Sequence, residues 1–204
     1  MRKGVKYMFK KLLMAILALA LVFGMSPLGM AAQNIRIAAS IGELHQMTVG
    51  LLKVTAAGQT PVSDLVGTGM DFGLLTKNVN NYLVSDAFFI VDTTVVSNHT
   101  TWNIAHTATD FTNGSVNLNG NVNVTFVKVN NATNDESLLS NGYVSYTTAK
   151  SKTILNTDLG TGFRLRIYYA IPNINTGNAS GVATIPMSQA TGSYVGTVIL
   201  TLSA

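Results

Sequence analysis

Apolar and polar residues alternate along several short stretches of the chain, as they do in β-strands that bury one face and expose the other. From residue 163 to 171, apolar residues at every second position alternate with arginine, tyrosine and alanine. Alternating or short apolar runs predict strands at residues 35–41, 47–54, 87–96, 102–106, 163–171 and 194–202. Residues 32–204 are rich in Thr and Val and contain only two glutamates, Glu43 and Glu136, so strands are favoured over helices.

Turn residues separate these runs. Asn113-Gly114, Asn119-Gly120 and Asn141-Gly142 suit type I′ hairpin turns, in which both central residues need a positive φ. We therefore expect an all-β fold, a single immunoglobulin-like or jelly-roll-like antiparallel β-sandwich over residues 32–204. Its core is expected to contain residues from the apolar faces of the predicted strands, namely Trp102, Ile104, Phe111, Tyr194, Val198, Leu200 and Leu202.

The first thirty-one residues have the pattern of a Sec-type signal peptide. Basic residues dominate positions 1–11, and an uncharged apolar stretch of 14 residues follows at positions 12–25, which is short for a membrane-spanning helix. Gly29 and Ala31 place small side chains before a cleavage site at Ala32. We expect residues 1–31 to be removed and the protein to be secreted, extracellular or at the cell surface, without a membrane anchor after cleavage.

The charge distribution and the absence of known motifs argue against several classes of function. The whole chain carries a formal charge of +4, but five of its basic residues lie in positions 1–31, and residues 32–204 have a net charge of −1. This excludes a basic nucleic-acid-binding protein. The chain has no cysteine, and its histidines, His45, His99 and His106, do not have the spacing of a zinc motif. We expect a non-catalytic protein without metal or cofactor, in which His106 packs on the same strand face as Trp102 and Ile104.

Two polar stretches leave alternatives open. At residues 116–126, asparagines at positions 117, 119, 121 and 123 alternate with apolar residues, either in a hairpin that turns at Asn119-Gly120 or in a strand that kinks there. The asparagine row could bind glycans, stack on another subunit or form a solvated face. Asp135-Glu136 could supply oxygen ligands to calcium, although adjacent acids are more typical of a solvated turn.

Two sequence patterns resemble families of surface proteins. Trp102-Asn-Ile104, followed by Phe111 and by Leu118-Asn-Gly120, resembles the first half of bacterial WxL surface domains. The alternating ending from Gly192 to Leu202 resembles the last strand of that family, and also that of spore coat protein U and related fimbrial subunits. These resemblances imply an exported, cysteine-free β-sandwich of the cell surface.

The segment Gln33–Gly42 carries the main functional hypothesis. Ile35, Ile37, Ala39 and Ile41 point one way at the period of a strand, so the segment can lie in an apolar groove and pair with a sheet edge. It either completes its own sandwich or inserts into a neighbouring subunit. We expect an exported cell-surface or fibre structural subunit that self-associates or contacts other surface proteins. The alternative is a module that binds cell-wall glycans or another polysaccharide.

Overall fold

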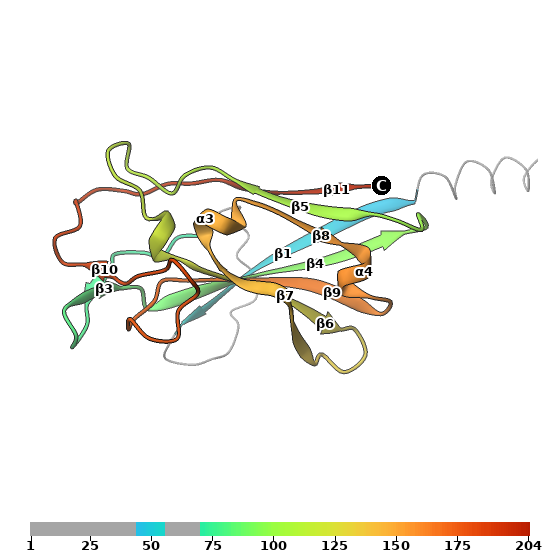
Figure 1. Ribbon diagram of the computed structural model, residues 1–204, viewed down its shortest axis with the longest axis horizontal. Helices are drawn as coiled ribbons and strands as arrows, with labels where there is room; N and C mark the ends of the chain where they lie inside the picture. Colours follow the sequence, from blue (N-terminus) through green and yellow to red (C-terminus); the bar gives the residue numbers. More distant parts are fainter. Residues whose placement is uncertain (1–43, 56–69) are drawn as a thin grey trace, which may run out of the picture. The chain divides into compact units, whose positions relative to one another are not determined.

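The computed structural model describes residues 44–55 and 70–204 and confirms an antiparallel β-sandwich. One sheet has five strands in the order β1-β4-β9-β6-β7. Their bounds are β1 His45–Thr55, β4 Ala87–Ser97, β9 Phe163–Ala170, β6 Asn123–Asn130 and β7 Glu136–Ser145. The facing sheet has the order β11-β5-β8, with β11 Val198–Ser203, β5 Asn103–Ala108 and β8 Ser151–Leu155 (Figure 1).

Smaller elements complete the described part of the chain. A third sheet at one end of the sandwich has the order β10-β3-β2, with β10 Ile185–Pro186, β3 Tyr82–Val84 and β2 Thr76–Lys77. The short helical turns are η1 Asn119–Asn121, α3 Tyr146–Ala149 and α4 Asn156–Leu159. No helix within the described residues is long and apolar enough to cross a membrane.

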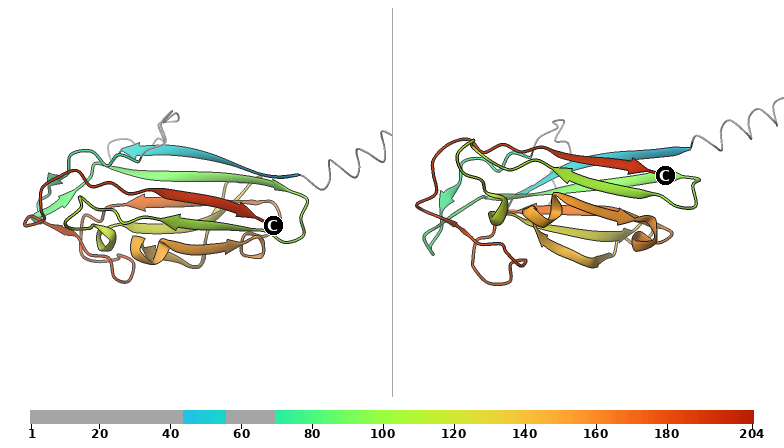
Figure 2. Two further views of the ribbon diagram at one scale, coloured as in Figure 1. Left: turned by 90° about the horizontal axis from the view of Figure 1, so that it is seen from above. Right: turned by 45° about the horizontal axis from the view of Figure 1, so that its top comes forward.

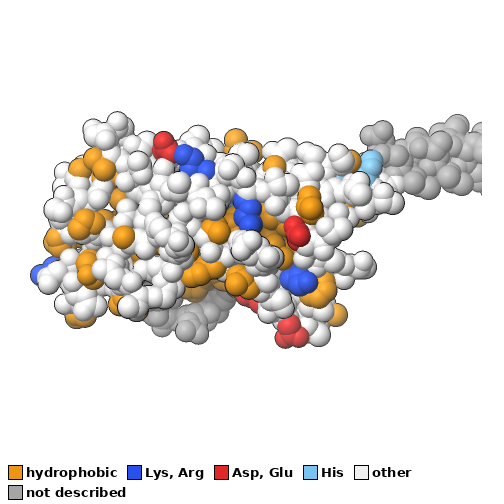
Figure 3. Space-filling model, in the orientation of Figure 1, with side chains coloured by type: hydrophobic (Ala, Val, Ile, Leu, Met, Phe, Trp, Pro, Cys, Tyr) orange, Lys and Arg blue, Asp and Glu red, His pale blue; other side chains and the backbone are white. Residues whose placement is uncertain are grey.

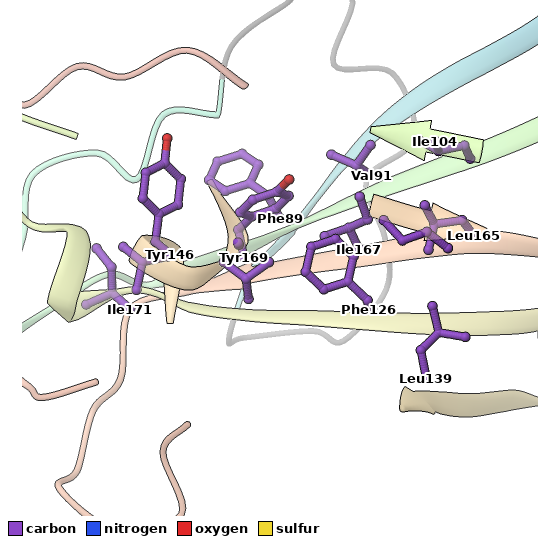
Figure 4. Close-up of a cluster of buried hydrophobic side chains, with 14 of the residues drawn as sticks. Phe89, Val91, Ile104, Phe126, Leu139, Tyr146, Leu165, Ile167, Tyr169 and Ile171 are labelled. Atoms are coloured by element: carbon purple, nitrogen blue, oxygen red, sulfur yellow. The ribbon is translucent and has the colours of Figure 1, made fainter. Parts of the chain in front are cut away.

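The core lies between the two large sheets. Alternate residues of β4 and β9 point into it, and Phe89, Leu165, Ile167 and Tyr169 are almost completely buried (Figure 4). β6 adds Phe126 from the same sheet. Burying apolar side chains of this size contributes on the order of 1.5–3 kcal/mol each, so this layer is the main source of stability.

The seven residues expected in the core differ in how far they are buried. Ile104 on β5 is fully buried. The other six are partly buried and pack against the core, namely Trp102, Phe111, Tyr194, Val198, Leu200 and Leu202. The part-exposed group includes every inward-facing residue of β11, and this is the first sign that the sandwich is less complete beside that strand.

Two of the three Asn-Gly hairpin predictions are wrong. Asn119-Gly120 lies in the turn η1, which leads directly into β6. Asn141-Gly142 lies inside β7, where the pairing with β6 shifts register and Asn141 has φ 51°. A Cβ on Gly142 would lie 2.5 Å from the Phe126 carbonyl oxygen, so glycine is required at this bulge. Asn113-Gly114 does lie in a turn, between Thr112 and Asn117, which pair in an isolated bridge, but only Gly114 has a positive φ, so this turn is not type I′.

The strand at 194–202 is also shorter than expected, because β11 begins at Val198. The signal peptide, residues 1–31, and the expected assembly strand, with Ile35, Ile37, Ala39 and Ile41, lie outside the described residues.

Candidate assembly edge

The two sides of the sandwich differ in how far the second sheet covers the first. Viewed from above, β11, β5 and β8 overlie the part of the large sheet that holds β9, β6 and β7, whereas β1 and β4 extend beyond β11 (Figure 2). β1 and β11 are the edge strands of their sheets on this side. We call the strip between them the open edge. It consists of β11, the inward face of β1 and the end of β4.

Apolar side chains are left accessible along the open edge. Met47 and Leu51 on β1 pack against the core but are only partly buried. Val49 lies between them on the same face of the strand and is 48% exposed. Val95 near the end of β4 and Leu200 on β11 are likewise only partly buried. An inward sheet face that remains this accessible has room for one more layer of side chains.

The backbone of β11 offers a partner for that layer. All six residues of β11 pair with β5, from Val198 opposite Ala108 to Ser203 opposite Asn103. Among the described strands, β5 is the one neighbour of β11, so the other edge of β11 presents backbone N–H and C=O groups. Such an edge can accept an added strand through main-chain hydrogen bonds.

A cavity of about 440 Å³ opens between the sheets at the start of β11. We call it the edge groove. It is lined by Met70, Phe72, Phe111, Val122, Tyr146, Tyr169, Gly196, Thr197 and Val198. None of these residues is charged, so the groove is suited to an apolar occupant.

Aromatic contacts fix the walls of the edge groove. The Phe72 ring meets the buried Phe89 ring edge-on with centroids 5.0 Å apart, and it lies 6.2 Å from the Phe111 ring. Tyr146 donates a hydrogen bond from its hydroxyl group to the Thr109 carbonyl oxygen at 3.1 Å. Its pKa is raised, mainly by burial and also by the charge of Asp110. Because this hydroxyl group already donates to a backbone acceptor, it does not need a hydrogen bond from an occupant of the groove.

A second cavity of about 440 Å³, the end pocket, lies next to the edge groove and shares Met70, Phe72 and Phe111 with it. Its other walls include Leu83 and Ile185 of the third sheet, Leu74 and Leu75 just before β2, and residues 189–194. Tyr194 at its rim donates a hydrogen bond to the Ala190 carbonyl oxygen at 2.7 Å. The space-filling view shows few charged side chains and a gathering of apolar ones at the end that holds β3 and β10 (Figure 3).

His106 lies deeper between the sheets and is fully buried. Its Nδ1 is 2.6 Å from the Ala149 carbonyl oxygen and therefore carries the proton, while Nε2 accepts a hydrogen bond from the Tyr169 hydroxyl group at 2.7 Å. Desolvation lowers the pKa of His106, although the Ala149 hydrogen bond opposes this effect. The imidazole is thus a neutral link between β5, α3 and β9.

The asparagine row binds the protein's own backbone. Asn119 accepts a hydrogen bond from the Phe111 amide at 2.8 Å. Asn121 donates to the Ala183 carbonyl oxygen at 2.9 Å, and Asn123 accepts from the Ala179 amide at 2.9 Å. Asn119 and Asn123 are buried, so these two side chains are not free to bind a glycan, whereas Asn117 is exposed. Asn121 and Asn123 thus tie the long connection between β9 and β11 to the start of β6.

Charged groups are paired on the outer face of the large sheet. Asp92 on β4 forms ion pairs with Arg164 and Arg166 of β9, and Arg166 also pairs with Glu136 of β7. Glu136 therefore lies in a strand and a salt bridge, and Asp135 accepts a hydrogen bond from the Thr133 hydroxyl group at 2.6 Å. Across residues 44–55 and 70–204, no three His, Asp or Glu side chains gather as metal ligands.

The edge groove was missed by the sequence analysis. Phe111 and Val198 were expected in the core, but Met70 and Phe72 lie outside the alternating runs, and Tyr146 follows directly after β7. Residues that are distant in sequence meet there only through the sheet topology.

Comparison of the chain with protein-family models, with curated proteins and with solved structures finds no match. The resemblance to WxL domains, spore coat protein U and fimbrial subunits therefore stays a prediction.

Proposed function

We propose that the protein is an exported, non-catalytic structural subunit of a surface fibre, in which the segment Gln33–Gly42 of one copy occupies the open edge of the next. The observation that carries this proposal is the combination of a β11 backbone edge to which no described strand is paired and an accessible apolar strip that includes Val49, 48% exposed. A strand placed there would both extend the smaller sheet and cover the strip.

The segment has the composition that this position needs. Ile35, Ile37, Ala39 and Ile41 would face the strip, while Arg36, Ala38 and Ser40 would face solvent. Ten extended residues span about 33 Å at roughly 3.3 Å per residue, enough to run along the six residues of β11 and past its start. The segment would follow directly after signal cleavage at Ala32, so export would free it for assembly.

The length of the connection to β1 favours a neighbouring copy over the protein's own sandwich. β1 begins at His45 in the larger sheet, while the open place is beside β11 in the smaller sheet. Packed sheets lie about 10 Å apart. Three residue steps, from Gly42 to His45, reach only about 10–11 Å when fully extended, with no residue left for the reversal. If the segment inserted into its own sandwich, some of its residues would have to form the chain reversal and could not pair with β11. If it inserted into another copy, all ten residues could pair.

A pair of variants tests this function in the exported protein. Ile37→Asp places a charge on the face that would be buried, and Ala38→Asp places the same charge on the opposite face. Size-exclusion chromatography and electron microscopy should show polymers for the wild type and for Ala38→Asp, and folded monomers for Ile37→Asp. Polymers of Ile37→Asp would refute the proposal, and an unfolded Ile37→Asp monomer would indicate that the strand belongs to its own sandwich.

The end pocket supports a second candidate function, a polysaccharide-binding module. Phe111 and Tyr194 form part of its wall with ring centroids 6.1 Å apart, and aromatic rings of this kind can stack on sugars. Calorimetric titration with soluble cell-wall glycan fragments tests it. Binding by the wild type that is lost in Tyr194→Ala would favour this function over the structural one.

A further inference from the structure

We infer that the inserted strand runs antiparallel to β11 with Ser40 opposite Ile199, so that Ile41 of the neighbouring copy enters the edge groove. This inference rests on the proposed function and adds the direction, the register and the anchoring residue. The occupant is a named segment of a second copy of this chain, Gln33–Gly42.

The direction follows from where the chain leaves the sandwich. β1 begins at the end where β11 finishes (Figures 1 and 2). The edge groove is lined by Thr197 and Val198 and the end pocket by Tyr194, so both cavities lie near the start of β11. A parallel strand would bring Gly42 of the donor to the Ser203 end of β11. An antiparallel strand would bring Gly42 to the Val198 end, where the cavities are. Antiparallel pairing is also slightly more stable per residue.

The register follows from matching apolar residues on the inward face. With Ile41 opposite Val198, Ala39 lies opposite Leu200 and Ile37 opposite Leu202. Val198 lines the edge groove, so the large Ile41 side chain meets the open volume and the small Ala39 side chain meets the middle of β11. Directly opposed side chains on one face of an antiparallel pair contact each other.

The same register would also cover two exposed apolar residues that lie beyond the paired segments, one in the donor and one in the acceptor. Counting on from Ile41, Leu44 of the donor falls opposite Val195 of the acceptor. Leu44 is 47% exposed and Val195 is 66% exposed. In the parallel orientation Leu44 would lie at the opposite end from Val195. Only the antiparallel orientation therefore lets these two side chains cover each other.

Cysteine cross-linking tests the inference cleanly, because the chain has no cysteine. The antiparallel register predicts inter-chain disulfides for Ser40→Cys with Ile199→Cys and for Arg36→Cys with Ser203→Cys. The parallel orientation predicts the exchanged pairs, Ser40→Cys with Ser203→Cys and Arg36→Cys with Ile199→Cys. Ile199 and Ser203 are exposed, so cysteines there leave the core intact. Opposed residues in an antiparallel pair have the Cα separation that a disulfide needs.

Full-length exported double-cysteine proteins are oxidised and run on non-reducing gels, with the single-cysteine variants as controls that can form dimers at most. A reducible ladder from the first two pairs alone supports the inference. A ladder from the exchanged pairs, or from all four, overturns the inference and leaves the proposed function standing. Disulfides confined to monomers overturn both. No disulfide in any pair overturns the inference, and the Ile37→Asp polymer assay then decides the proposed function on its own.

A second readout uses side-chain size. If Ile41 anchors the strand, Ile41→Ala should reduce the polymer fraction at equal protein concentration more than Ile35→Ala does. The reverse order would contradict the orientation.

Discussion

The two sides of this sandwich are built from the same kinds of strand, yet one is closed and the other open. On the side of β7 and β8, Leu139 is 6% exposed and Ile154 is 1% exposed, and both belong to the core. On the side of β1 and β11, Val49 is 48% exposed on the inward face. The difference shows that β-strand pattern alone does not decide whether a sandwich edge is covered.

The connections between strands explain the contrast. On the closed side, β7, α3, β8, α4 and β9 follow one another along the chain and pass from one sheet to the other. Ala149 of α3 and Leu159 of α4 are buried where the chain crosses. On the open side, β1 is the first described strand and β11 the last, and no described segment links their facing edges.

The exposed edges also differ in their protection against further pairing. β7 carries Glu136 in an ion pair and a register shift at Asn141-Gly142, and both features discourage the addition of another strand. β11 pairs with β5 in unbroken register and carries the exposed Ile199. By these criteria β7 resists strand addition and β11 permits it.

The largest expected effect is on the closed side. Ile154→Ala removes a fully buried side chain and should lower the free energy of unfolding by about 2–5 kcal/mol. Val49→Ala on the open side should cost less than about 1 kcal/mol in the isolated monomer, because much of the side chain is already in solvent. Urea unfolding of both variants measures the contrast. Equal losses would mean that the two sides are equally covered.

Gly142→Ala should have the next largest effect, about 1–3 kcal/mol, because the new methyl group would lie 2.5 Å from the Phe126 carbonyl oxygen and 2.8 Å from that of Leu139. Gly50→Ala is the matched control in a strand of the open side, where the nearest atom to the new methyl group is the Asp92 carbonyl oxygen at 3.9 Å. Thermal unfolding midpoints compare the two. A Gly142→Ala protein as stable as Gly50→Ala would disprove the tight bulge.

A smaller, pH-dependent effect is expected at His106. Its pKa in the folded protein is lowered, mainly by burial, so the unfolded chain binds the proton more readily. The stability from neutral His106 is fully present above the unfolded pKa of about 6.5 and is lost as the pH falls below it. The midpoint of unfolding should therefore fall between pH 7 and pH 5, and fall less in His106→Gln. Parallel pH profiles for the two proteins would rule out this role.

Much of the sandwich could be predicted from the sequence, because alternation at a period of two marks one buried face of each strand. The buried position of Ile104 and the alternation along β9 follow directly from that pattern. The turns at Asn119 and Asn141 could not be predicted in the same way. Local Asn-Gly propensity favours a hairpin, but Asn119 is needed to bind the Phe111 amide, and Gly142 is needed where β7 bulges against β6.

The site could be predicted only in part. The alternation along Gln33–Gly42 predicts a strand whose apolar face is buried against another apolar surface. The surface itself depends on which strands become sheet edges and on contacts such as that between Phe72 and Phe111, 6.2 Å apart between ring centroids. Such contacts join residues distant in sequence, and the topology that creates them is not visible in strand periodicity.

Peptide complementation tests the central claim most directly. A protein that begins at Glu43 is unfolded by heat with and without a synthetic peptide of residues Gln33–Gly42, and the same peptide carrying Ile37→Asp is the control. If the segment fills the open edge, the native peptide should raise the unfolding midpoint in a concentration-dependent way, and the control peptide should not. An unfolding midpoint that stays the same at saturating concentrations of the native peptide would contradict the account.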